Sequence, residues 1–314
     1  MLPSVLESVS DLTLHDIKEL LSLARHIKRL GPTSFSPHQL DFTVALIFDE
    51  NSTRTKFSFI KSLQYLKFHT IDLIPDQSSM KKGETMEETL CTLRAQGINL
   101  AIIRRSIPGE LHGFKNSPPL PLINGGDGMH QHPTQALLDL LTMIENGEDP
   151  KGKTVAIIGD SRHSRVTHSL LQLFEMWETK VILCGPKSSL PRPYESPFIS
   201  WSNDVNETIE RADILYLLRM QNERHAKFQD SNFFSDYAQL FQINGERLEK
   251  YPRPIYHPGP SNISVEISRD VLKGPWYRGY SQVEHAIYVR MALLWTYYLD
   301  HKRQAKGHGP EVRR

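Results

Sequence analysis

Short apolar runs alternate with amphipathic stretches along most of the chain. In the first half, the runs cover residues 43–48, 70–74, 100–103 and 121–123, and each has the length and composition of a buried strand. The stretches between them have helical periodicity, and this alternation is typical of parallel strands joined by crossover helices. The pattern predicts a first lobe built on a parallel sheet.

A second alternating series follows, with apolar runs at residues 154–160, 180–183, 214–218 and 254–257. Between the two series, residues 132–141 predict a helix that starts after a proline, and the Gly and Pro of residues 147–150 end it. We therefore expect an α/β fold with two doubly wound parallel-sheet domains and an interdomain active-site cleft.

Two other segments have patterns of their own. Val283, Ile287, Met291 and Leu294 recur at helical spacing, which predicts a last helix that packs its apolar face against one of the lobes. Residues 188–202 are rich in Pro and Ser and predict an irregular loop.

Composition narrows the class of protein. The 314 residues suffice for two domains of ordinary size, and 37 Lys and Arg against 36 Asp and Glu give no argument for nucleic acid or an acidic membrane surface. The start of the chain lacks the features of a signal peptide, and no apolar run reaches the roughly 20 residues of a membrane span. We expect a soluble cytoplasmic protein in which Cys91 and Cys184 are buried, reduced thiols.

Basic and small polar residues follow the predicted strands. Because ligands of open parallel sheets bind beyond the carboxyl ends of the strands, these segments are the candidate site: residues 52–55, 78–84, 104–105, 125–128, 160–165, 219–224 and 257–260. The chain has no Cys or His pair at metal-ligand spacing, no nucleophile elbow and no Walker lysine motif. Arginines dominate instead, which favours a substrate with several negative charges and a reaction driven by positioning and charge stabilisation.

Residues 48–56 contain the strongest local signal. Ser52, Thr53, Arg54 and Thr55 stand where an apolar strand turns into a helix that Asn51 or Ser52 can cap. Free backbone N–H groups and the helix dipole favour an anion there, and an arginine adds a planar donor fork for phosphate oxygens. Taken alone, the same residues also fit an ordinary helix cap with a surface arginine.

Five motifs resemble those of the aspartate/ornithine carbamoyltransferases in order and spacing. They are residues 52–55, Lys82-Gly83-Glu84, His132-Pro133-Thr134-Gln135, the Arg219-x-Gln221-x-Glu223-Arg224 run and His257-Pro258-Gly259-Pro260. The similarity spans residues 12–294, and the chain resembles the aspartate branch because the Ser-Met-Gly loop and the Cys of ornithine enzymes are absent. It implies a carbamoyl phosphate-binding domain over residues 1–134, completed by a C-terminal helix over 287–314, and an aspartate-binding domain over 135–286.

The resemblance implies transfer of a carbamoyl group from carbamoyl phosphate to L-aspartate, the committed step of de novo pyrimidine (UMP) synthesis, without cofactor or metal. The implied catalytic residues are Arg54, Thr55, Lys82, Arg104 and His132. Those implied to bind carbamoyl phosphate are Ser52, Thr53, Arg54, Thr55, Ser78, Ser79, Arg104, His132, Gln135, Gly259 and Pro260. Thr55, Arg104 and His132 would hold the carbonyl oxygen, and the departing phosphate would take the proton of the amine.

Further implied roles concern aspartate and assembly. Aspartate would be bound by Lys82, Arg165 for the α-carboxylate, and Arg219 with Gln221 for the β-carboxylate. Lys82 and Ser78 or Ser79 would lie on a loop that reaches a neighbouring subunit's site, which implies a homotrimer. A separate regulatory chain or dihydroorotase is a possible partner in this family. Glu50 would form an ion pair between the domains.

Several of these residues have simpler alternatives. His132 could satisfy only a structural hydrogen bond, Lys82 could be a solvated loop lysine, and Arg165 could pair only with Glu50. Arg104 and Arg105 could both be surface charges after a strand, and the resemblance selects Arg104 as the site residue. Residues 125–128 could serve only to turn the chain.

Four positions depart from the family pattern: Asp49, Asn51, Lys56 and Ile263. Asp49 would oppose anion binding if its side chain pointed inward. Ile263 stands where many relatives have arginine, from which we expect weaker aspartate binding. The Michaelis constant for aspartate before and after Ile263→Arg tests that expectation, and an unchanged constant contradicts it.

Two other functions fit parts of the sequence. A catalytically silent relative that acts as a scaffold or regulator is disfavoured because the site residues are present. A nucleotide-dependent dehydrogenase is disfavoured because the residues after Gly159 do not form a G-x-G-x-x-G motif.

Overall fold

The computed structural model describes residues 1–35, 41–191, 196–220 and 233–307. The chain divides into two compact units. Unit 1 contains Met1–Leu137 and the segment that begins at His285, and unit 2 contains Leu138–Glu284. Two helices, α4 (Pro133–Glu145) and α10 (Gly279–Gly307), each contribute residues to both units.

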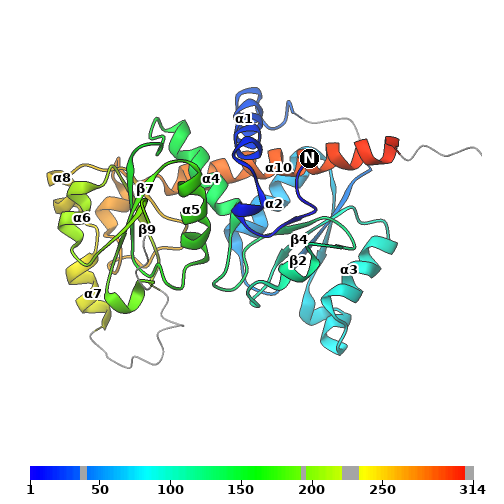
Figure 1. The fold of residues 1–314 in the computed structure, drawn as a ribbon, viewed down its shortest axis with the longest axis horizontal. Helices are drawn as coiled ribbons and strands as arrows, with labels where there is room; N and C mark the ends of the chain where they lie inside the picture. The colour runs from blue at the N-terminus through cyan, green and yellow to red at the C-terminus, as the bar shows by residue number, and fades with distance from the viewer. Residues whose placement is uncertain (36–40, 192–195, 221–232, 308–314) are drawn as a thin grey trace, which may run out of the picture. The chain divides into compact units, whose positions relative to one another are not determined.

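Unit 1 is built on a five-stranded parallel sheet with strand order β1-β5-β4-β2-β3 (Figure 1). Its strands are β1 (Val5–Leu6), β2 (Thr43–Phe48), β3 (His69–Leu73), β4 (Leu100–Arg104) and β5 (Leu122–Asn124). The central strands β2 and β4 are almost wholly buried, as expected for a parallel sheet covered on both faces. β1 was not predicted, because two apolar residues give too short a signal.

Helices cover both faces of this sheet. Leu90 and Leu93 of α3 (Met86–Ala95) pack with Ala45, Ile47 and Ile103 on one face. The helices α1 (Leu14–Leu30), α2 (Thr53–Leu66) and α10 lie on the other side of the strands (Figure 1). Single-turn helices occupy the connections: η1 (Val9–Asp11), η2 (Pro75–Gln77), η3 (Ser79–Lys82) and η4 (Glu110–Phe114).

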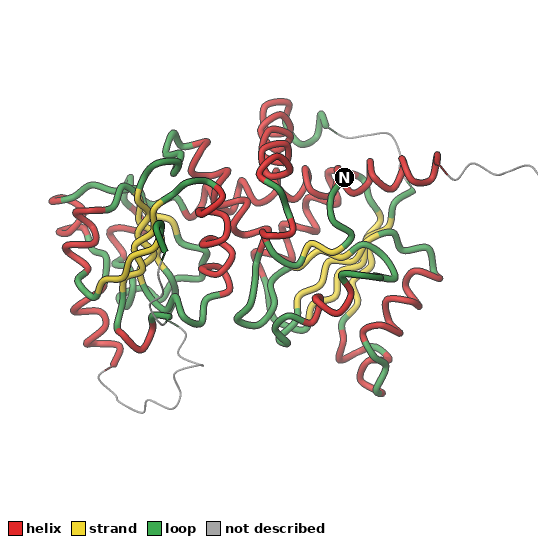
Figure 2. Tube along the Cα trace, viewed as in Figure 1, coloured by secondary structure: helices red, strands yellow, loops and turns green. Residues whose placement is uncertain are grey.

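Unit 2 contains a second five-stranded parallel sheet, with order β10-β9-β6-β7-β8 (Figure 2). Its strands are β6 (Thr154–Ile158), β7 (Lys180–Cys184), β8 (Ile199–Ser202), β9 (Ile214–Leu217) and β10 (Ile255–Tyr256). Its shorter helices are α5 (Arg165–Met176), η5 (Lys187–Ser189), α6 (Val205–Arg211), α7 (Phe233–Phe241), α8 (Gly245–Lys250) and α9 (Arg269–Lys273). The expected fold class is confirmed: both sheets are parallel and flanked by helices.

The structure corrects three details. Residues 199–202 form β8, so the irregular loop predicted over 188–202 is wrong at its end; only partly buried residues carry the strand, which weakens its apolar signal. Val283 is 44% exposed, so the apolar stripe of α10 is buried only from its later turns. Cys91 is exposed, while Cys184 is buried as expected, and both thiols are free.

Among the helices that the structure describes, none combines the length and the apolar character needed to cross a lipid bilayer.

Candidate active site

The turn from β2 to α2 presents a helix N-terminus with small polar residues around it. Ser52 takes the N-cap position, but its side chain does not hydrogen-bond to the first turn of α2. Thr53 and Arg54 are exposed and Thr55 is buried. The first N–H groups of a helix lack intrahelical partners and carry partial positive charge, so this turn can bind an anion.

Asp49 is held away from this turn by the segment after β4. Its Oδ1 accepts a hydrogen bond from the N–H of Ser106 at 2.9 Å, and its Oδ2 lies 3.1 Å from Nε of Arg105. The same Nε lies 3.0 Å from Glu110. Burial raises the pKa of Glu110 and Asp49 adds to the rise, although the neighbouring Arg105 opposes it. Two carboxylates thus engage Arg105, and the concern that Asp49 repels an anion loses its basis.

Arg104, Thr55 and His132 come together in unit 1 from three different elements. Oγ1 of Thr55 lies 3.3 Å from Nε2 of His132, and both side chains are buried. Arg104, the last residue of β4, donates from Nη1 to the carbonyl of Gly125 at 3.2 Å. Its Nε lies 3.2 Å from Oε2 of Glu50. The expected pairing of Glu50 with an arginine of the second lobe stays a prediction.

Gly126 makes this close approach possible. Its φ of +106° is a conformation that L side chains rarely adopt, and a Cβ there would lie 3.1 Å from Cδ2 of His132 and 3.2 Å from Nη1 of Arg104. Gly128 is also constrained, since a Cβ would lie 2.7 Å from the carbonyl oxygen of Ser106. Gly126 therefore allows Arg104 and His132 to share one space, a role beyond the simple turn considered above.

His132 and Gln135 are fixed by the start of α4. Pro133 is the first residue of the helix, where its missing N–H costs nothing. Gln135 follows His132 by three positions, so both side chains project from the same end of the helix, and Gln135 is 9% exposed. A carbonyl oxygen and an amide of one small ligand could be reached from this turn.

A cluster of ionisable residues holds the loop before His132. Glu7, Asp127 and His130 place ligand atoms within 4.8 Å of one another. Asp127 already accepts hydrogen bonds on both oxygens, among them from the N–H of Gly109 at 2.6 Å and of Gln131 at 2.9 Å. Nζ of Lys115 lies 3.0 Å from Glu7 and balances its charge. The cluster is the one group among the described residues with the donor set for a metal ion, but an ammonium group already occupies part of it.

The same lysine also contacts Asp11, at 2.7 Å. Burial alone would lower the pKa of Lys115, but its hydrogen bonds to Asp11 and Glu7 raise the pKa above its ordinary value. The lysine therefore stays charged, and it joins the end of η4 to η1.

Ser78, Ser79 and Lys82 lie on a separate surface segment of unit 1. Ser78 caps η3 by accepting from the N–H of Met80 at 3.2 Å and donates to the carbonyl of Pro75 at 2.8 Å. Ser79 and Lys82 are exposed. Their expected role in a neighbouring subunit stays a prediction.

In unit 2, Arg165 and Arg219 follow adjacent strands. Arg165 opens α5, whose N-cap Ser164 accepts from the N–H of Thr167 at 3.2 Å, and Arg219 follows β9. β6 and β9 pair in parallel, so both arginines lie at the carboxyl edge of the sheet. Gly159 has φ +129°, and a Cβ there would lie 2.9 Å from the carbonyl of Leu218. Gln221 lies outside the described residues.

The loop after β10 meets the segment of Arg219. Nδ1 of His257 accepts from the N–H of Gly259 at 2.8 Å, and the peptide bond from Gly259 to Pro260 is cis. The side chain of Asn262 donates to the carbonyl of Met220 at 3.1 Å. The described residues that were predicted for unit 2 therefore belong to connected loops at one edge of its sheet.

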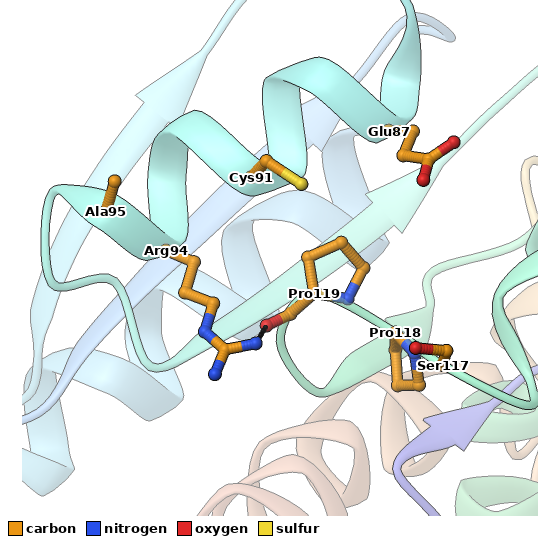
Figure 3. A pocket seen from close by; sticks show the side chains of 7 residues that line it. All are labelled: Glu87, Cys91, Arg94, Ala95, Ser117, Pro118 and Pro119. Carbon is orange, nitrogen blue, oxygen red and sulfur yellow. Dashed lines mark hydrogen bonds between the residues drawn. The ribbon is translucent and has the colours of Figure 1, made fainter.

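Unit 1 also has a surface hollow that is lined by none of the predicted site residues. Its walls are Glu87, Cys91, Arg94 and Ala95 of α3 and residues 117–119, and Nη1 of Arg94 donates to the carbonyl of Pro119 at 2.9 Å (Figure 3). None of these residues was predicted for the site. Its volume is about 500 Å³.

Two residues that support the β2–α2 turn, Ser58 and Arg290, were not predicted from the sequence. Ser58 donates to the carbonyls of Arg54 and Thr55, and Arg290 donates to Ser58. The one sequence feature that could have indicated Arg290 is its position as a lone arginine among the apolar residues of α10.

Comparison with known proteins covers nearly the whole chain. Residues 5–145 match the model of the aspartate/ornithine carbamoyltransferase carbamoyl-P binding domain, and residues 151–297 match that of the Asp/Orn binding domain. The aspartate carbamoyltransferase catalytic subunit of Syntrophobacter fumaroxidans is 37% identical over 91% of this chain and 94% of its own. That of Flavobacterium johnsoniae is 36% identical over 90% and 92%.

Two solved structures are similar throughout. Aspartate transcarbamoylase from Trypanosoma cruzi in complex with N-(phosphonacetyl)-L-aspartic acid has a TM-score of 0.83 at 28% identity, over 94% of this chain and 96% of that chain. The catalytic subunit of M. jannaschii aspartate transcarbamoylase has a TM-score of 0.82 at 29% identity, over 96% and 99%. The expected resemblance is confirmed, and the chain belongs to the aspartate/ornithine carbamoyltransferase family.

Proposed function

We propose that this protein is an aspartate carbamoyltransferase, which transfers the carbamoyl group of carbamoyl phosphate to the amino group of L-aspartate. The products are N-carbamoyl-L-aspartate and phosphate. The observation that carries the proposal is the convergence of Thr55, Arg104 and His132 close to the N-terminus of α2. The names of the relatives and the domain models that match both halves of the chain support it.

Carbamoyl phosphate would bind through unit 1. The N–H groups at the start of α2, the side chains of Ser52 and Thr53, and the guanidinium of Arg54 suit the phosphate. Thr55, Arg104 and His132 suit the carbonyl oxygen, and Gln135 suits the carbamoyl amide. The solved Trypanosoma cruzi enzyme in complex with carbamoyl phosphate supports this class of ligand.

The transfer step needs charge stabilisation rather than a protein nucleophile. The nitrogen of the neutral amine attacks the carbonyl carbon, and the carbonyl oxygen gains negative charge. Fixed donors from Thr55, Arg104 and His132 stabilise that charge because they are already oriented and buried. The bond from carbon to the phosphate oxygen then breaks, and the departing phosphate takes the proton of the amine.

Aspartate would be selected by unit 2. Arg165 and Arg219 offer two planar guanidinium groups at one sheet edge, which suit the two carboxylates of aspartate. Gln221, outside the described residues, would assist Arg219, and Gly259 and Pro260 would line the carbamoyl phosphate side. Ornithine would bring a cation toward these arginines, so repulsion rejects it.

A homotrimer with shared sites is part of the proposal. β3 is the edge strand of its sheet, and most of its residues are exposed. Phe57, Ile71 and Ile74 on the same part of unit 1 are 61%, 41% and 41% exposed. Because an open strand edge with apolar neighbours favours association, a second copy of the chain is its expected partner, and Lys82 would then reach that copy's site. We also propose that this reaction is the committed step of pyrimidine synthesis.

Binding of N-(phosphonacetyl)-L-aspartate tests the proposed site apart from turnover. This compound joins a phosphonate to aspartate, so it should need residues of both units. We expect Arg54→Ala and Arg219→Ala each to weaken calorimetric binding by about 10- to 100-fold, the value of a charged hydrogen bond. Arg211→Ala is the control, because Arg211 is an exposed arginine of α6 paired with Glu207. Equal binding by all three variants would contradict the assignment.

A further inference from the structure

Arg290 is a buried cation that contacts the second turn of α2. It is 1% exposed, and its guanidinium carbon lies 4.6 Å from the centroid of the Phe59 ring. Nη1 donates a hydrogen bond to Oγ of Ser58, the residue before Phe59. Burying a guanidinium costs folding free energy unless the group makes hydrogen bonds or other polar contacts. The contacts of Arg290 therefore show which part of the protein it stabilises.

The hydroxyl of Ser58 is also hydrogen-bonded to the first turn of α2. Its Oγ lies 2.6 Å from the carbonyl oxygen of Arg54 and 2.9 Å from that of Thr55. A serine hydroxyl has one proton. Because Arg290 donates to the oxygen of Ser58, the proton of Ser58 is left to point at these two carbonyls.

The carbonyl of Arg54 belongs to the same peptide group as the N–H of Thr55. A hydrogen bond that a carbonyl accepts polarises the peptide group, and chains of hydrogen bonds strengthen one another in a low dielectric. The N–H of Thr55 is one of the first N–H groups of α2, which have no intrahelical partner. It is therefore a better donor to an anion when Ser58 and Arg290 are in place.

We propose that Arg290 and Ser58 are positioning residues of the carbamoyl phosphate site. A chain of hydrogen bonds runs from Arg290 through Ser58 to the carbonyl of Arg54, and the N–H of Thr55 continues it to the phosphate. The positive charge of Arg290 thereby acts on the phosphate through α2. This inference rests on the proposed function, because it assumes that the phosphate lies at the start of α2.

Ser62 provides a matched control for Ser58. It is a buried serine one turn later in α2, and its hydroxyl donates to the carbonyls of Ser58 and Ile287 at 2.7 and 3.0 Å. It therefore also joins α2 to α10, but it does not contact the carbonyl of Arg54 or Thr55. If Ser58 had only a structural role, replacing Ser58 and replacing Ser62 would affect phosphate binding equally.

Calorimetric titration of the full-length protein with inorganic phosphate tests the chain. We expect Ser58→Ala to weaken phosphate binding about tenfold, the value of one ordinary hydrogen bond, and Ser62→Ala to leave it unchanged. The Michaelis constant for carbamoyl phosphate should rise with Ser58→Ala, while that for aspartate should not. Equal phosphate affinity of the two serine variants would overturn the proposal.

A double-mutant cycle tests the link to Arg290. Arg290→Met should weaken phosphate binding, and adding it to Ser58→Ala should produce little further loss, because both act through one chain. If Arg290→Met does not fold, Arg290→Lys is used in its place. Additive losses of phosphate affinity in the cycle would overturn the proposed link between Arg290 and Ser58. If the wild-type protein and Arg54→Ala both failed to bind phosphate, the proposed phosphate site itself would be wrong, and the proposal with it.

Discussion

Oγ1 of Thr55 lies 3.3 Å from Nε2 of His132, although 77 positions separate the two residues in the chain. Thr55 belongs to the first turn of α2, and His132 directly precedes α4. The fold thus brings a helix N-terminus that suits phosphate beside a histidine that suits a carbonyl oxygen.

Replacement of His132 tests the stabilisation of the oxyanion. We expect His132→Ala to lower kcat by about 100- to 1000-fold, the cost of removing one oriented donor to a developing oxyanion. The Michaelis constant for carbamoyl phosphate should change much less, because Arg54 and α2 still hold the phosphate. Steady-state kinetics measure both constants. His15→Ala, at an exposed histidine of α1, should keep full activity.

A wild-type kcat in His132→Ala would show that His132 serves only the structural hydrogen bond considered in the sequence analysis. The assignment of Thr55 and Arg104 to the same oxygen would then lose its support.

Replacement of Arg219 tests the selection of the acceptor. Arg219→Lys keeps the charge but loses the planar fork, so we expect the Michaelis constant for aspartate to rise about 10-fold or more while that for carbamoyl phosphate stays constant. Initial rates at varied aspartate measure the change. If only the Michaelis constant for carbamoyl phosphate rose, Arg219 would bind carbamoyl phosphate and not aspartate, and its assignment would be wrong.

The main outline of the fold could be predicted because its strands are short, buried and apolar. Each expected strand exists, and α4 begins at Pro133, the proline after which the helix was expected to start. β1 and β8 were not predicted, since β1 has two residues and β8 is only half buried. Such strands form because they pair with neighbouring strands of the sheet. The local pattern of apolar residues in the sequence carries no information about that pairing.

The sequence pointed to the site through its motifs, but it could not give the contacts. The direction of the Asp49 side chain depends on Arg105 and Ser106, more than 50 positions away in the chain. Gly126 looked like an ordinary turn residue, yet its missing side chain leaves room for Arg104 and His132. Such roles follow only from packing between distant segments.

Mixed trimers test whether Lys82 acts in a neighbouring subunit. We expect Lys82→Gln and His132→Ala each to be nearly inactive when purified alone. If the site takes Lys82 from one chain and His132 from another, random mixing of equal amounts should restore about one quarter of the wild-type activity. Activity is measured after the variants are dissociated together and reassembled.

Reassembly of each variant alone is the control for this experiment. No recovery in a mixture that sediments as a trimer would mean that both residues serve the same subunit. Full activity of Lys82→Gln when purified alone would mean that Lys82 is a solvated loop lysine.

The two cysteines should differ in reactivity. Burial raises the pKa of Cys184 from its ordinary 9.0 to about 11, whereas Cys91 is exposed. We expect one thiol per chain to react quickly with Ellman's reagent at pH 8 and the second to react only after unfolding, because the thiolate is the reactive form. Cys91→Ser should abolish the fast reaction. Fast reaction of both thiols would contradict the buried position of Cys184.

The same pKa shift predicts a dependence of stability on pH. Between pH 9 and about 11 the Cys184 thiol ionises in the unfolded chain but stays protonated in the folded one. The folded state binds the extra proton, so this group's contribution to the free energy of unfolding is lost as pH rises through that range. Cys184→Ala should show a smaller fall in the free energy of unfolding, measured by urea denaturation at pH 8 and pH 10.5.

Carbamoyl transfer by the purified protein, with L-aspartate and L-ornithine as parallel acceptors, tests the central proposal most directly. The proposed roles of Arg165 and Arg219 predict turnover of carbamoyl phosphate with aspartate and none with ornithine. Turnover with ornithine would contradict the proposed selection of aspartate. No turnover with either acceptor by a folded trimer would contradict the proposed function and favour a silent binding protein.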